Sequence, residues 1–479
     1  MDLTAVPGEP ATSPGAAHRR SLERLECLCD SGSLEQIRSA VVSPRLGGNA
    51  QLGDGVVAGF GRVSGRRIAC YAQDATFMGG SLGSAQAETI DRVLAMAARA
   101  RLPVVSFIES GGARMQEGAA ALYGYGRIFR QNVRLSTIVP QISIIGGLAA
   151  GGGCYSPALT DFVVMTEEAK MFLTGPRVVR EVTGEDITAE ELGGHRMHEQ
   201  NGVCHLVASS DHAAAALAQN LLGYLPQHVG GSLPQAVASD PAIGDPALEV
   251  PSSSRTVYDM RAASAGIVDA GSLLEISPRW GRSILTSFAR IEGRSIGLIA
   301  SQPRYLGGVL DVEASQKGAR FVKVCDTFGI PLVVLVDTPG FMPGRHQEEA
   351  GVIRFGSRLL QAFAAARVPR LTVILRKAYG GAFIAMNSKG LGADFVFAWP
   401  DAEIGVMSAH GATAIIHRRE LAAAANPDLT RDELTFAYAR EHLGAQVAAA
   451  GGFIDEVIEP SETRARLAGA LEILGDRDR

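Results

Sequence analysis

The amino-acid sequence predicts an α/β protein built from two tandem copies of one layered domain. In the first half of the 479-residue chain, strand-like apolar runs alternate with segments of helical periodicity, an order typical of layered α/β folds. The same order returns in the second half at a nearly constant spacing. In each half, an apolar run also ends in glycines that open a helix-compatible segment. Together these three observations indicate an internal duplication.

The elements of the first copy can be assigned in order along the chain. Alternating charge and leucine predict an amphipathic helix over 21–37, with a turn at Asp30-Ser-Gly-Ser33. The other predicted elements are strands over 55–66 and 68–73 joined by a Ser-Gly hairpin turn, a helix over 84–101, a strand over 102–108, a glycine turn at Gly111-Gly112, a buried strand over 142–145, a turn over 146–153 and a helix from Tyr155.

The duplication can be counted directly in the sequence. Phe60-Gly-Arg-Val-Ser-Gly-Arg66 matches Phe288-Ala-Arg-Ile-Glu-Gly-Arg294, a spacing of 288 − 60 = 228. Further upstream, the turn at Asp30 matches Asp269-Ala-Gly-Ser272 at a spacing of 239. We expect the copies to join near the Pro- and Ser-rich stretch 230–254. Other pairs at a spacing of 228 are Gly79-Gly80 with Gly307-Gly308, Pro103 with Pro331, and Gly112 with Gly340.

Each copy carries one glycine turn after an equivalent strand. The first lies in QISIIGGLAAGGGCYSPALTD (141–161), and the second is KAYGGAFI (377–384) after the apolar run 371–375. Such a turn leaves unpaired N–H groups at the positive end of a helix, where an anion or a developing oxyanion can bind. Plain tight packing is the alternative for a single turn. Two turns in register favour function, and we interpret them as two oxyanion holes.

Composition excludes several classes of function. A net charge of −5 without a basic block gives no footprint for nucleic acid. The uncharged run 141–160 has about the length of a membrane span, but Gln141 and the glycines interrupt it, so no membrane segment is expected. No histidine or cysteine spacing matches a metal site. Six scattered cysteines fit a reducing cytoplasm. Residues 1–20 are expected to form a disordered lead-in.

A long, ordered set of motifs runs along nearly the whole chain. The motifs are GGSLGSAQAETI, SGGARMQEG, YSPALTDFV, FLTGPRVVREVTGED, ELGG, YDMR, GARFVKVCDTFGIPLV, DTPGFMPG, RKAYGGAF and AWPDAEI. In this order, from about residue 22 to 466, the chain resembles the carboxyltransferase (β) subunit of biotin-dependent acyl-CoA carboxylases.

The resemblance implies a crotonase-like ββα spiral in each copy. It implies an N-terminal domain over 21–235 that binds acyl-CoA as substrate and a C-terminal domain over 255–479 that binds biotin. Gly151 and Gly152 would hold the acyl-CoA oxygen, and Gly381 and Ala382 the biotin oxygen. The substrate-binding residues it implies are Gly111, Gly112, Ala113, Ala150, Tyr155, Tyr379, Gly380, Phe383 and Ile384. A homo-oligomer is implied, at least a dimer and usually a hexamer.

Absent motifs point to a partner. The chain has no A-M-K-M-like biotin attachment site, since Glu168-Ala-Lys-Met171 lacks the first methionine, and it has no P-loop. We therefore expect biotin, its carrier and the biotin carboxylase on a separate α subunit. Arg114, Glu117, Arg376 and Lys377 flank the glycine turns; a solvated or salt-bridged role is the default interpretation for them.

The sequence departs from the family pattern at a few positions. Glu109 replaces the usual Asp or Asn, Ile384 is apolar at a pocket position that bears on acyl-chain choice, and Ala350 and Phe355 alter a helix start near the biotin side. The chain also stops at Arg479 without the basic tail that relatives often carry. The apolar Ile384 suggests tolerance beyond propionyl-CoA, including acetyl-CoA or longer chains, whereas Ala350, Phe355 and the short C-terminus suggest altered contact with an α subunit.

Three alternative functions stay open at this point. A biotin-dependent acyl-CoA decarboxylase or transcarboxylase subunit would use the same oxyanion holes in the reverse direction. A crotonase-type hydratase or isomerase would need a catalytic carboxylate over the substrate, for which Glu109 is the candidate. A non-catalytic paralogue that stabilises an active relative would have no need of two glycine turns.

Overall fold

The computed structural model describes residues 18–475, which form two compact units that divide between Ser232 and Leu233. Each unit contains an eight-stranded, mostly parallel sheet, and the strand order is the same in both. The prediction of an α/β fold duplicated in tandem is therefore confirmed. The units divide within the stretch 230–254, which was expected to join the copies, and its residues from Leu233 onward belong to the second unit. Of the predicted lead-in, residues 1–17 lie outside the described residues, whereas Arg19 and Arg20 are helical, which corrects that prediction.

The first unit follows the order β1-β2-β3-β4-β5-β6-β8, with β7 paired to β5. Its strands are β1 Glu35–Gln36, β2 Val56–Val63, β3 Arg66–Gln73, β4 Val104–Ser110, β5 Gln141–Ala150, β6 Phe162–Thr166, β7 Lys170–Phe172 and β8 Leu206–Ala208. Its helices are α1 Arg19–Leu28, α2 Ser84–Ala100, α3 Ala119–Leu135, α4 Gly152–Ala158, α5 Pro176–Thr183, α6 Ala189–Gly193, α7 His195–Gln200 and α8 Asp211–Tyr224.

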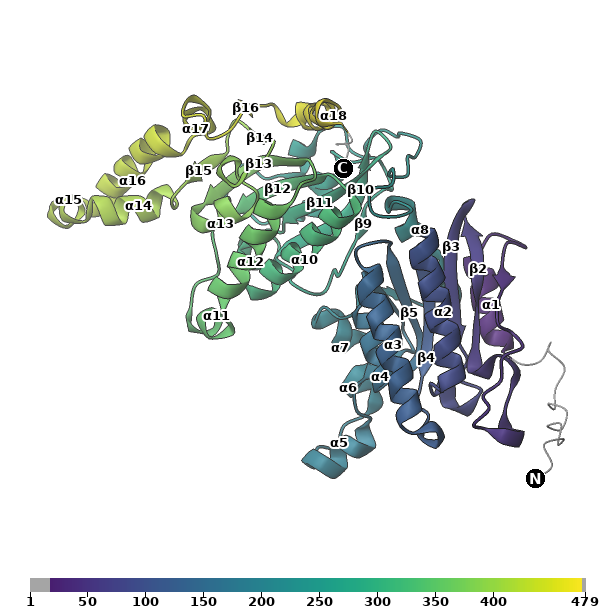
Figure 1. Ribbon diagram of the computed structural model, residues 1–479. Helices are drawn as coiled ribbons and strands as arrows, with labels where there is room; N and C mark the ends of the chain where they lie inside the picture. The colour runs from purple at the N-terminus through teal and green to yellow at the C-terminus, as the bar shows by residue number, and fades with distance from the viewer. Residues whose placement is uncertain (1–17, 476–479) are drawn as a thin grey trace, which may run out of the picture. The chain divides into compact units, whose positions relative to one another are not determined.

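Helices cover both faces of this sheet, since every residue of β4 is buried. Helices α2 and α3 lie side by side across the strands (Figure 1), and Ile108 of β4 joins their apolar core. The neighbouring Phe107 and Glu109 point to the other face, where they meet Arg24 of α1. Alternate residues of one strand thus serve two cores.

The second unit repeats this plan with the order β16-β14-β13-β12-β11-β10-β9 and β15 paired to β13. Its strands are β9 Leu274–Glu275, β10 Ile284–Ile291, β11 Arg294–Ser301, β12 Leu332–Thr338, β13 Arg370–Tyr379, β14 Phe395–Ala398, β15 Glu403–Gly405 and β16 Glu456–Val457. Its helices are α9 Met260–Ala265, α10 Val312–Phe328, α11 Arg345–Ala350, α12 Val352–Ala365, α13 Gly380–Ala385, α14 Ala409–Ile416, α15 Arg418–Ala423, α16 Pro427–Tyr438, α17 Ala445–Ala450 and α18 Thr463–Leu474.

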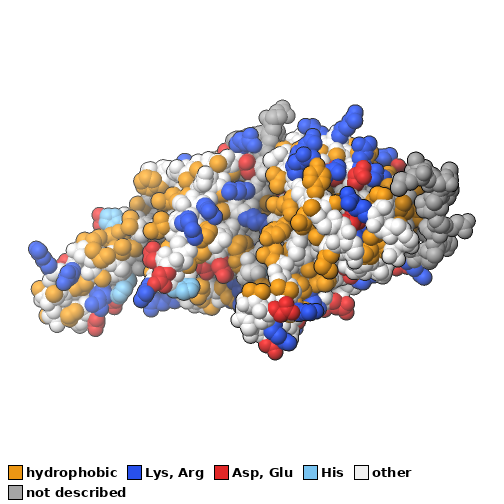
Figure 2. All heavy atoms as spheres, turned by 60° about the horizontal axis from the view of Figure 1, so that its bottom comes forward, with side chains coloured by type: hydrophobic (Ala, Val, Ile, Leu, Met, Phe, Trp, Pro, Cys, Tyr) orange, Lys and Arg blue, Asp and Glu red, His pale blue; other side chains and the backbone are white. Residues whose placement is uncertain are grey.

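The two units differ most in the segment that follows β7 in the first unit and β15 in the second. Isolated bridges close this segment at Lys170↔Gly194 in the first unit and at Glu403↔Gly444 in the second. The first closure spans 194 − 170 = 24 residues and the second 444 − 403 = 41. The extra length forms an arm of α14, α15 and α16, and hydrophobic side chains gather on it at the left of Figure 2. Its exposed apolar residues include Ile415, Ile416, Leu429 and Phe436.

Several predicted elements have different bounds in the structure: the strand expected over 102–108 is Val104–Ser110, the strand expected over 142–145 is Gln141–Ala150, and the helix expected from Tyr155 begins at Gly152. The helix expected over 21–37 ends at Leu28, because Cys29 is extended and Asp30 turns to accept hydrogen bonds from Ser64 N and Gly65 N of the β2–β3 hairpin. The turn expected over 146–153 is much shorter, since β5 continues to Ala150 and α4 begins at Gly152. The glycines there accommodate a shift in strand register and not a loop.

Candidate active site

The first glycine turn joins the end of β5 to the start of α4. Gly151 has φ 55° and ψ −124°, a backbone conformation that is accessible to glycine and strained for other residues. Its N–H donates to Phe172 O at 3.1 Å, so Gly151 itself is not the free donor that the sequence analysis expected. Gly152 is the first residue of α4, so its N–H has no acceptor within the helix. Among residues 18–475 it donates to no backbone carbonyl outside the helix either.

A second loop from the neighbouring strand lies against this turn. A Cβ built on Gly151 would lie 3.9 Å from the Gly112 Cα, and one built on Gly112 would lie 3.5 Å from Ala150 O. The loop is held from behind, since Leu82 N donates to Gly112 O and Arg114 N donates to Leu82 O. The predicted residues Gly111, Gly112, Ala113, Ala150, Gly151, Gly152 and Tyr155 therefore come together at the carboxyl ends of β4 and β5, with Tyr155 exposed.

The second unit builds the same pair of loops. Gly380 has φ 59° at the start of α13, and Gly381 and Ala382 follow in its first turn, where N–H groups lack intrahelical acceptors. Leu310 N donates to Gly340 O, as Leu82 does to Gly112. The predicted residues Tyr379, Gly380, Gly381, Ala382, Phe383 and Ile384 gather here, and Ile384 is exposed.

A shared irregularity in the sheets places both turns. Between Ile108 and Ser110, strand β5 advances from Ile145 to Ala149, four residues against two. In the second unit β13 advances from Ile374 to Ala378 while β12 advances from Val336 to Thr338. A bulge of this kind redirects the end of a strand. Both turns thus leave their sheets in the same way. Tight packing that arose independently at each turn would not explain this shared geometry.

Phe341 is a site residue that the sequence analysis missed. It occupies the position equivalent to Ala113, because Leu82↔Ala113 and Leu310↔Phe341 are matching bridges. Its ring would lie 3.6 Å from a Cβ on Gly381 and 3.0 Å from one on Gly356. The second site therefore has an aromatic wall where the first has a methyl group. The spacing of 228 residues was the signal that could have identified it.

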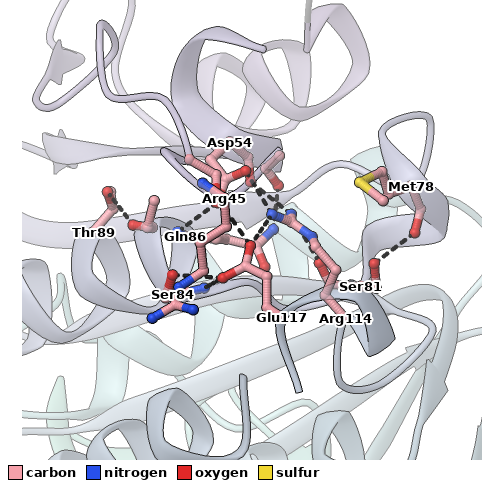
Figure 3. A network of polar contacts seen from close by, with 12 residues as sticks. Arg45, Asp54, Met78, Ser81, Ser84, Gln86, Thr89, Arg114 and Glu117 are labelled. Atoms are coloured by element: carbon pink, nitrogen blue, oxygen red, sulfur yellow. Dashed lines mark hydrogen bonds and ion pairs between the residues drawn. The ribbon is translucent and has the colours of Figure 1, made fainter. Parts of the chain in front are cut away.

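A buried ionic network holds the loop that contains Gly112 (Figure 3). Arg114 is fully buried and donates to Asp54 Oδ1 at 2.7 Å and to Glu117 Oε1 at 2.9 Å. Glu117 also accepts from Ser84 N and from the Ser84 and Ser43 hydroxyls. Burial raises the pKa of Asp54 against the opposing effect of Arg114. Arg114 and Glu117 are therefore structural ion-pair residues and do not face a ligand.

Glu109 lies in a second network behind the bulge of β5. Its Oε2 accepts from Arg24 Nη1 at 2.6 Å, and Arg24 also donates to Gly146 O at 3.2 Å and to Asp211. A Cβ on Gly147 would lie 2.2 Å from Glu109 Oε1, so glycine there makes room for the carboxylate. Glu109 is thus committed to Arg24, which argues against an acid/base role over the substrate.

In the second unit the residue equivalent to Glu109 is Asp337, and its cationic partner lies on a strand of the sheet, whereas the partner of Glu109 lies on α1. Asp337 is fully buried and accepts from Arg376 Nε at 2.8 Å. Arg376 is on β13 itself and also donates to the carbonyls of Pro251, Ser253 and Thr256. Lys377 donates to Ser254 O at 2.8 Å. Arg376 and Lys377 therefore connect strand β13 to the segment 251–256. Their contacts agree with the default interpretation, which made them salt-bridged residues.

Tyr379 was predicted to bind substrate, but its hydroxyl is already engaged. The ring is buried and the hydroxyl donates to Glu403. Burial, together with that carboxylate, raises the pKa of Tyr379 far above its usual range. The phenol therefore stays protonated and helps to fix the turn.

The described residues add two structural findings. Among residues 18–475 no helix has the length and apolar character needed to cross a membrane. Within the same residues, no group of three His, Cys, Asp or Glu side chains is placed to hold a metal ion. Each turn instead offers backbone N–H donors at an open helix start. Such donors can stabilise negative charge that develops on a carbonyl oxygen.

Comparison with known proteins places this arrangement in a family. The carboxyl transferase domain family matches residues 17–479. The chain is 47% identical over 423 residues to the methylmalonyl-CoA carboxyltransferase 12S subunit of Propionibacterium freudenreichii subsp. shermanii, covering 88% of this chain and 81% of that protein. It is 44% identical to the propionyl-CoA carboxylase beta chain of Saccharopolyspora erythraea (96% and 88% covered). It is also 44% identical to the methylmalonyl-CoA decarboxylase subunit alpha of Veillonella parvula (89% and 83% covered).

Solved structures agree with the sequence relatives. The crystal structure of transcarboxylase 12S, a hexamer with methylmalonyl-coenzyme A and methylmalonic acid bound, has a TM-score of 0.91 and 45% identity over 95% of this chain and 88% of that one. A single-chain, multi-domain long-chain acyl-CoA carboxylase has a TM-score of 0.84 and 32% identity over 94% of this chain and 45% of that one. The chain therefore belongs to the carboxyl transferase family and is a carboxyltransferase made of two tandem crotonase-like domains.

Proposed function

We propose that the chain is the carboxyltransferase subunit of a biotin-dependent acyl-CoA carboxylase, with a short-chain acyl-CoA as substrate. The domain over 21–235 would bind the acyl-CoA, and the domain over 255–479 would bind biotin. The observation that carries this proposal is the pair of equivalent turns, one after β5 and one after β13, each with N–H groups open at a helix start.

The residues of the chain fit two substrates whose oxygens become negative. A Cβ built on Gly151 meets no atom within 3.8 Å, and one built on Gly381 meets only the Phe341 ring, so both turns are open to a ligand. The N–H of Gly152 would hold the thioester oxygen of the acyl-CoA as its α-carbon loses a proton. The N–H groups of Gly381 and Ala382 would hold the ureido oxygen of biotin. One such donor typically contributes about 3 kcal/mol of transition-state stabilisation.

When bound, carboxybiotin would supply the carboxyl group, and the biotin that remains after its release would accept the α-proton. The chain then needs no side-chain base, which is consistent with the engagement of nearby ionisable groups. Glu109 is paired with Arg24, Asp337 with Arg376, and Tyr379 with Glu403. The role left to the protein is to orient two substrates and to stabilise charge.

The substrate class follows from the relatives. They include a methylmalonyl-CoA carboxyltransferase, a propionyl-CoA carboxylase and a methylmalonyl-CoA decarboxylase at 44–47% identity. Methylmalonyl-CoA is the carboxylated form of propionyl-CoA, so all three names share one half-reaction, carboxyl exchange with propionyl-CoA. We assign that half-reaction to this chain, with acetyl-CoA as a second acceptor because Ile384 is apolar and exposed at the second turn.

The proposal includes partners. Biotin, its carrier and the biotin carboxylase would reside on an α subunit, and the pair would act in the cytoplasm, where the free thiols found here stay reduced. A homo-hexamer is proposed for the chain itself. The exposed apolar side chains of the α14–α16 arm support self-association, since such patches usually mark interfaces. Light scattering of the purified chain tests this, and a monomer at micromolar concentration would contradict it.

A substitution at the second turn tests the proposed function. Gly381→Val places its Cβ in van der Waals contact with the Phe341 ring, at 3.6 Å, and adds two methyl groups to the turn where the ureido oxygen would bind. We expect that the variant no longer removes the carboxyl group from methylmalonyl-CoA in the presence of biotin, whereas it still binds the CoA substrate. Gly469→Val, on α18 where a Cβ meets no atom within 4 Å, is the control. Full activity of the Gly381 variant would defeat the assignment.

A further inference from the structure

A tyrosine of helix α3 lies directly against the first glycine turn. Tyr125 is buried, and a Cβ built on Gly152 would lie 2.7 Å from Cδ2 of its ring. An approach this close leaves room only for glycine. The ring therefore packs against the residue whose N–H opens helix α4.

The hydroxyl group of the same side chain contacts the neighbouring loop. The Tyr125 hydroxyl lies within hydrogen-bond distance of Ser110 Oγ, at 3.1 Å, and this oxygen also accepts a hydrogen bond from Gly112 N at 3.3 Å. Ser110 is buried at the end of β4. Burial raises the pKa of Tyr125 to about 12, so the phenol keeps its proton at neutral pH. One side chain thus connects helix α3, the loop that contains Gly112 and the turn that opens α4.

The second unit has an aromatic ring at the equivalent turn but takes it from another element. Helices α3 and α12 bury corresponding residues at a spacing of 356 − 125 = 231, so the position of Tyr125 is Gly356. The ring beside Gly381 is that of Phe341, whose equivalent in the first unit is Ala113. The matching buried positions are Ala121 with Val352, Tyr125 with Gly356, Ile128 with Leu359, Gln131 with Ala362, and Asn132 with Phe363.

A large and a small residue have therefore changed places between the two units. The first unit combines Tyr125 with the small Ala113, whereas the second combines Phe341 with Gly356, where a Cβ would lie 3.0 Å from the ring. Each turn keeps one aromatic ring against the glycine in the first turn of its helix, although the element that supplies the ring differs. This indicates that the turn itself requires the ring.

We propose that Tyr125 is a positioning residue for carboxyl exchange at the first turn. Its ring holds the Cα of Gly152 and thereby the direction of the Gly152 N–H, and its hydroxyl group fixes the adjacent loop through Ser110. The oxygen of the acyl-CoA would then meet a donor that does not move as negative charge develops, which is the condition for effective oxyanion stabilisation. The inference rests on the proposed binding of acyl-CoA at this turn.

Steady-state kinetics of biotin-dependent carboxyl loss from methylmalonyl-CoA tests the two parts of the side chain separately. Tyr125→Phe keeps the ring and removes the hydroxyl group, and kcat should fall roughly tenfold, the upper end for one neutral hydrogen bond. Tyr125→Gly also removes the ring, and kcat should fall at least about 100-fold, as when one oxyanion donor is lost. KM should change by less than about threefold in both variants, because such a donor acts mainly in the transition state.

Transferring the arrangement of the second unit tests whether the ring is what matters. The double variant Ala113→Phe/Tyr125→Gly supplies a ring from the loop, and its kcat should be at least about tenfold higher than that of Tyr125→Gly. Tyr224→Phe is the control and should keep normal turnover. This buried tyrosine ends α8 at the opposite edge of the sheet, where Leu222 O accepts from Arg66 at the start of β3.

The outcomes distinguish this inference from the proposed function. A wild type without biotin-dependent turnover would overturn the proposed function itself. If the wild type is active and Tyr125→Phe keeps kcat within about threefold of it, or if KM rises as much as kcat falls, the positioning role is wrong. A double variant that regains its unfolding midpoint in denaturant but not its kcat would also contradict the role. Tyr125→Phe decides the question even if the glycine variants fail to fold.

Discussion

Replacing Gly151 by alanine tests how the first turn works. The new Cβ meets no atom within 3.8 Å, so the substitution adds no clash. It does force alanine into φ 55° and ψ −124°, where such a residue is strained by about 1–3 kcal/mol. We expect the backbone to relax by rotating the peptide between Gly151 and Gly152, which turns the Gly152 N–H away from the site.

The magnitude follows from the loss of one donor. Removing a single oxyanion donor typically costs about 2.7–4 kcal/mol of barrier, or roughly 100- to 1000-fold in kcat. Because such a donor acts mainly in the transition state, kcat and kcat/KM should fall together while KM changes little. The assay is biotin-dependent loss of the carboxyl group from methylmalonyl-CoA.

Gly65→Ala is the matched control. Gly65 also has a positive φ, 78°, and open space around its Cβ position, but it lies in the β2–β3 hairpin. It should show a similar modest loss of stability and normal turnover. If Gly151→Ala retains activity within about threefold of the wild type, or if both variants lose activity equally, the reasoning about the turn fails.

Two further predictions concern buried charges. Arg24→Met removes the buried partner of Glu109 and leaves this carboxylate only the half-exposed Arg20 guanidinium, 3.6 Å away. It should lower the free energy of unfolding by about 3 kcal/mol in denaturant titration. Arg19→Met on the same helix, at an exposed pair, should change nothing measurable, and equal effects would contradict this account. Burial lowers the pKa of Lys317 to about 8 from 10.5, so the unfolded chain binds more protons between these values and stability due to this group rises with pH there. Relative to Lys317→Met, the wild type should gain about 2 kcal/mol between pH 7 and 9.5, and parallel pH profiles would refute the shift.

Much of the architecture could be predicted because the chain repeats itself. A spacing of 228 residues indicated which strands correspond, and β4 and β12 follow it, whereas the bulged strands β5 and β13 correspond at a spacing of 229, as Ala149 and Ala378 show. The periodicity also gave the helices of the core with small errors at their ends. The arm of α14 to α16 was not predicted, since it has no counterpart of equal length in the first half and buries little of its own surface.

The candidate site was predicted less completely than the fold. Glycines mark positive φ, so Gly151 and Gly380 could be recognised from sequence. Which N–H is free depends on strand β7, whose Phe172 carbonyl accepts from Gly151, and no local pattern reveals that contact. Arg24 and Glu109 are 85 residues apart in the chain, and no pattern in a single sequence indicates that two such distant residues form an ion pair.

The central claim is that this chain performs carboxyl exchange between biotin and an acyl-CoA through its two turns. The most direct measurement uses the purified chain with carboxyl-labelled methylmalonyl-CoA or malonyl-CoA, with and without free biotin. The account predicts label loss that requires biotin, yields propionyl-CoA or acetyl-CoA, and disappears in both the Gly151→Ala and the Gly381→Val variants. Loss at the same rate without biotin, or no transfer of label to biotin from either substrate, would contradict it.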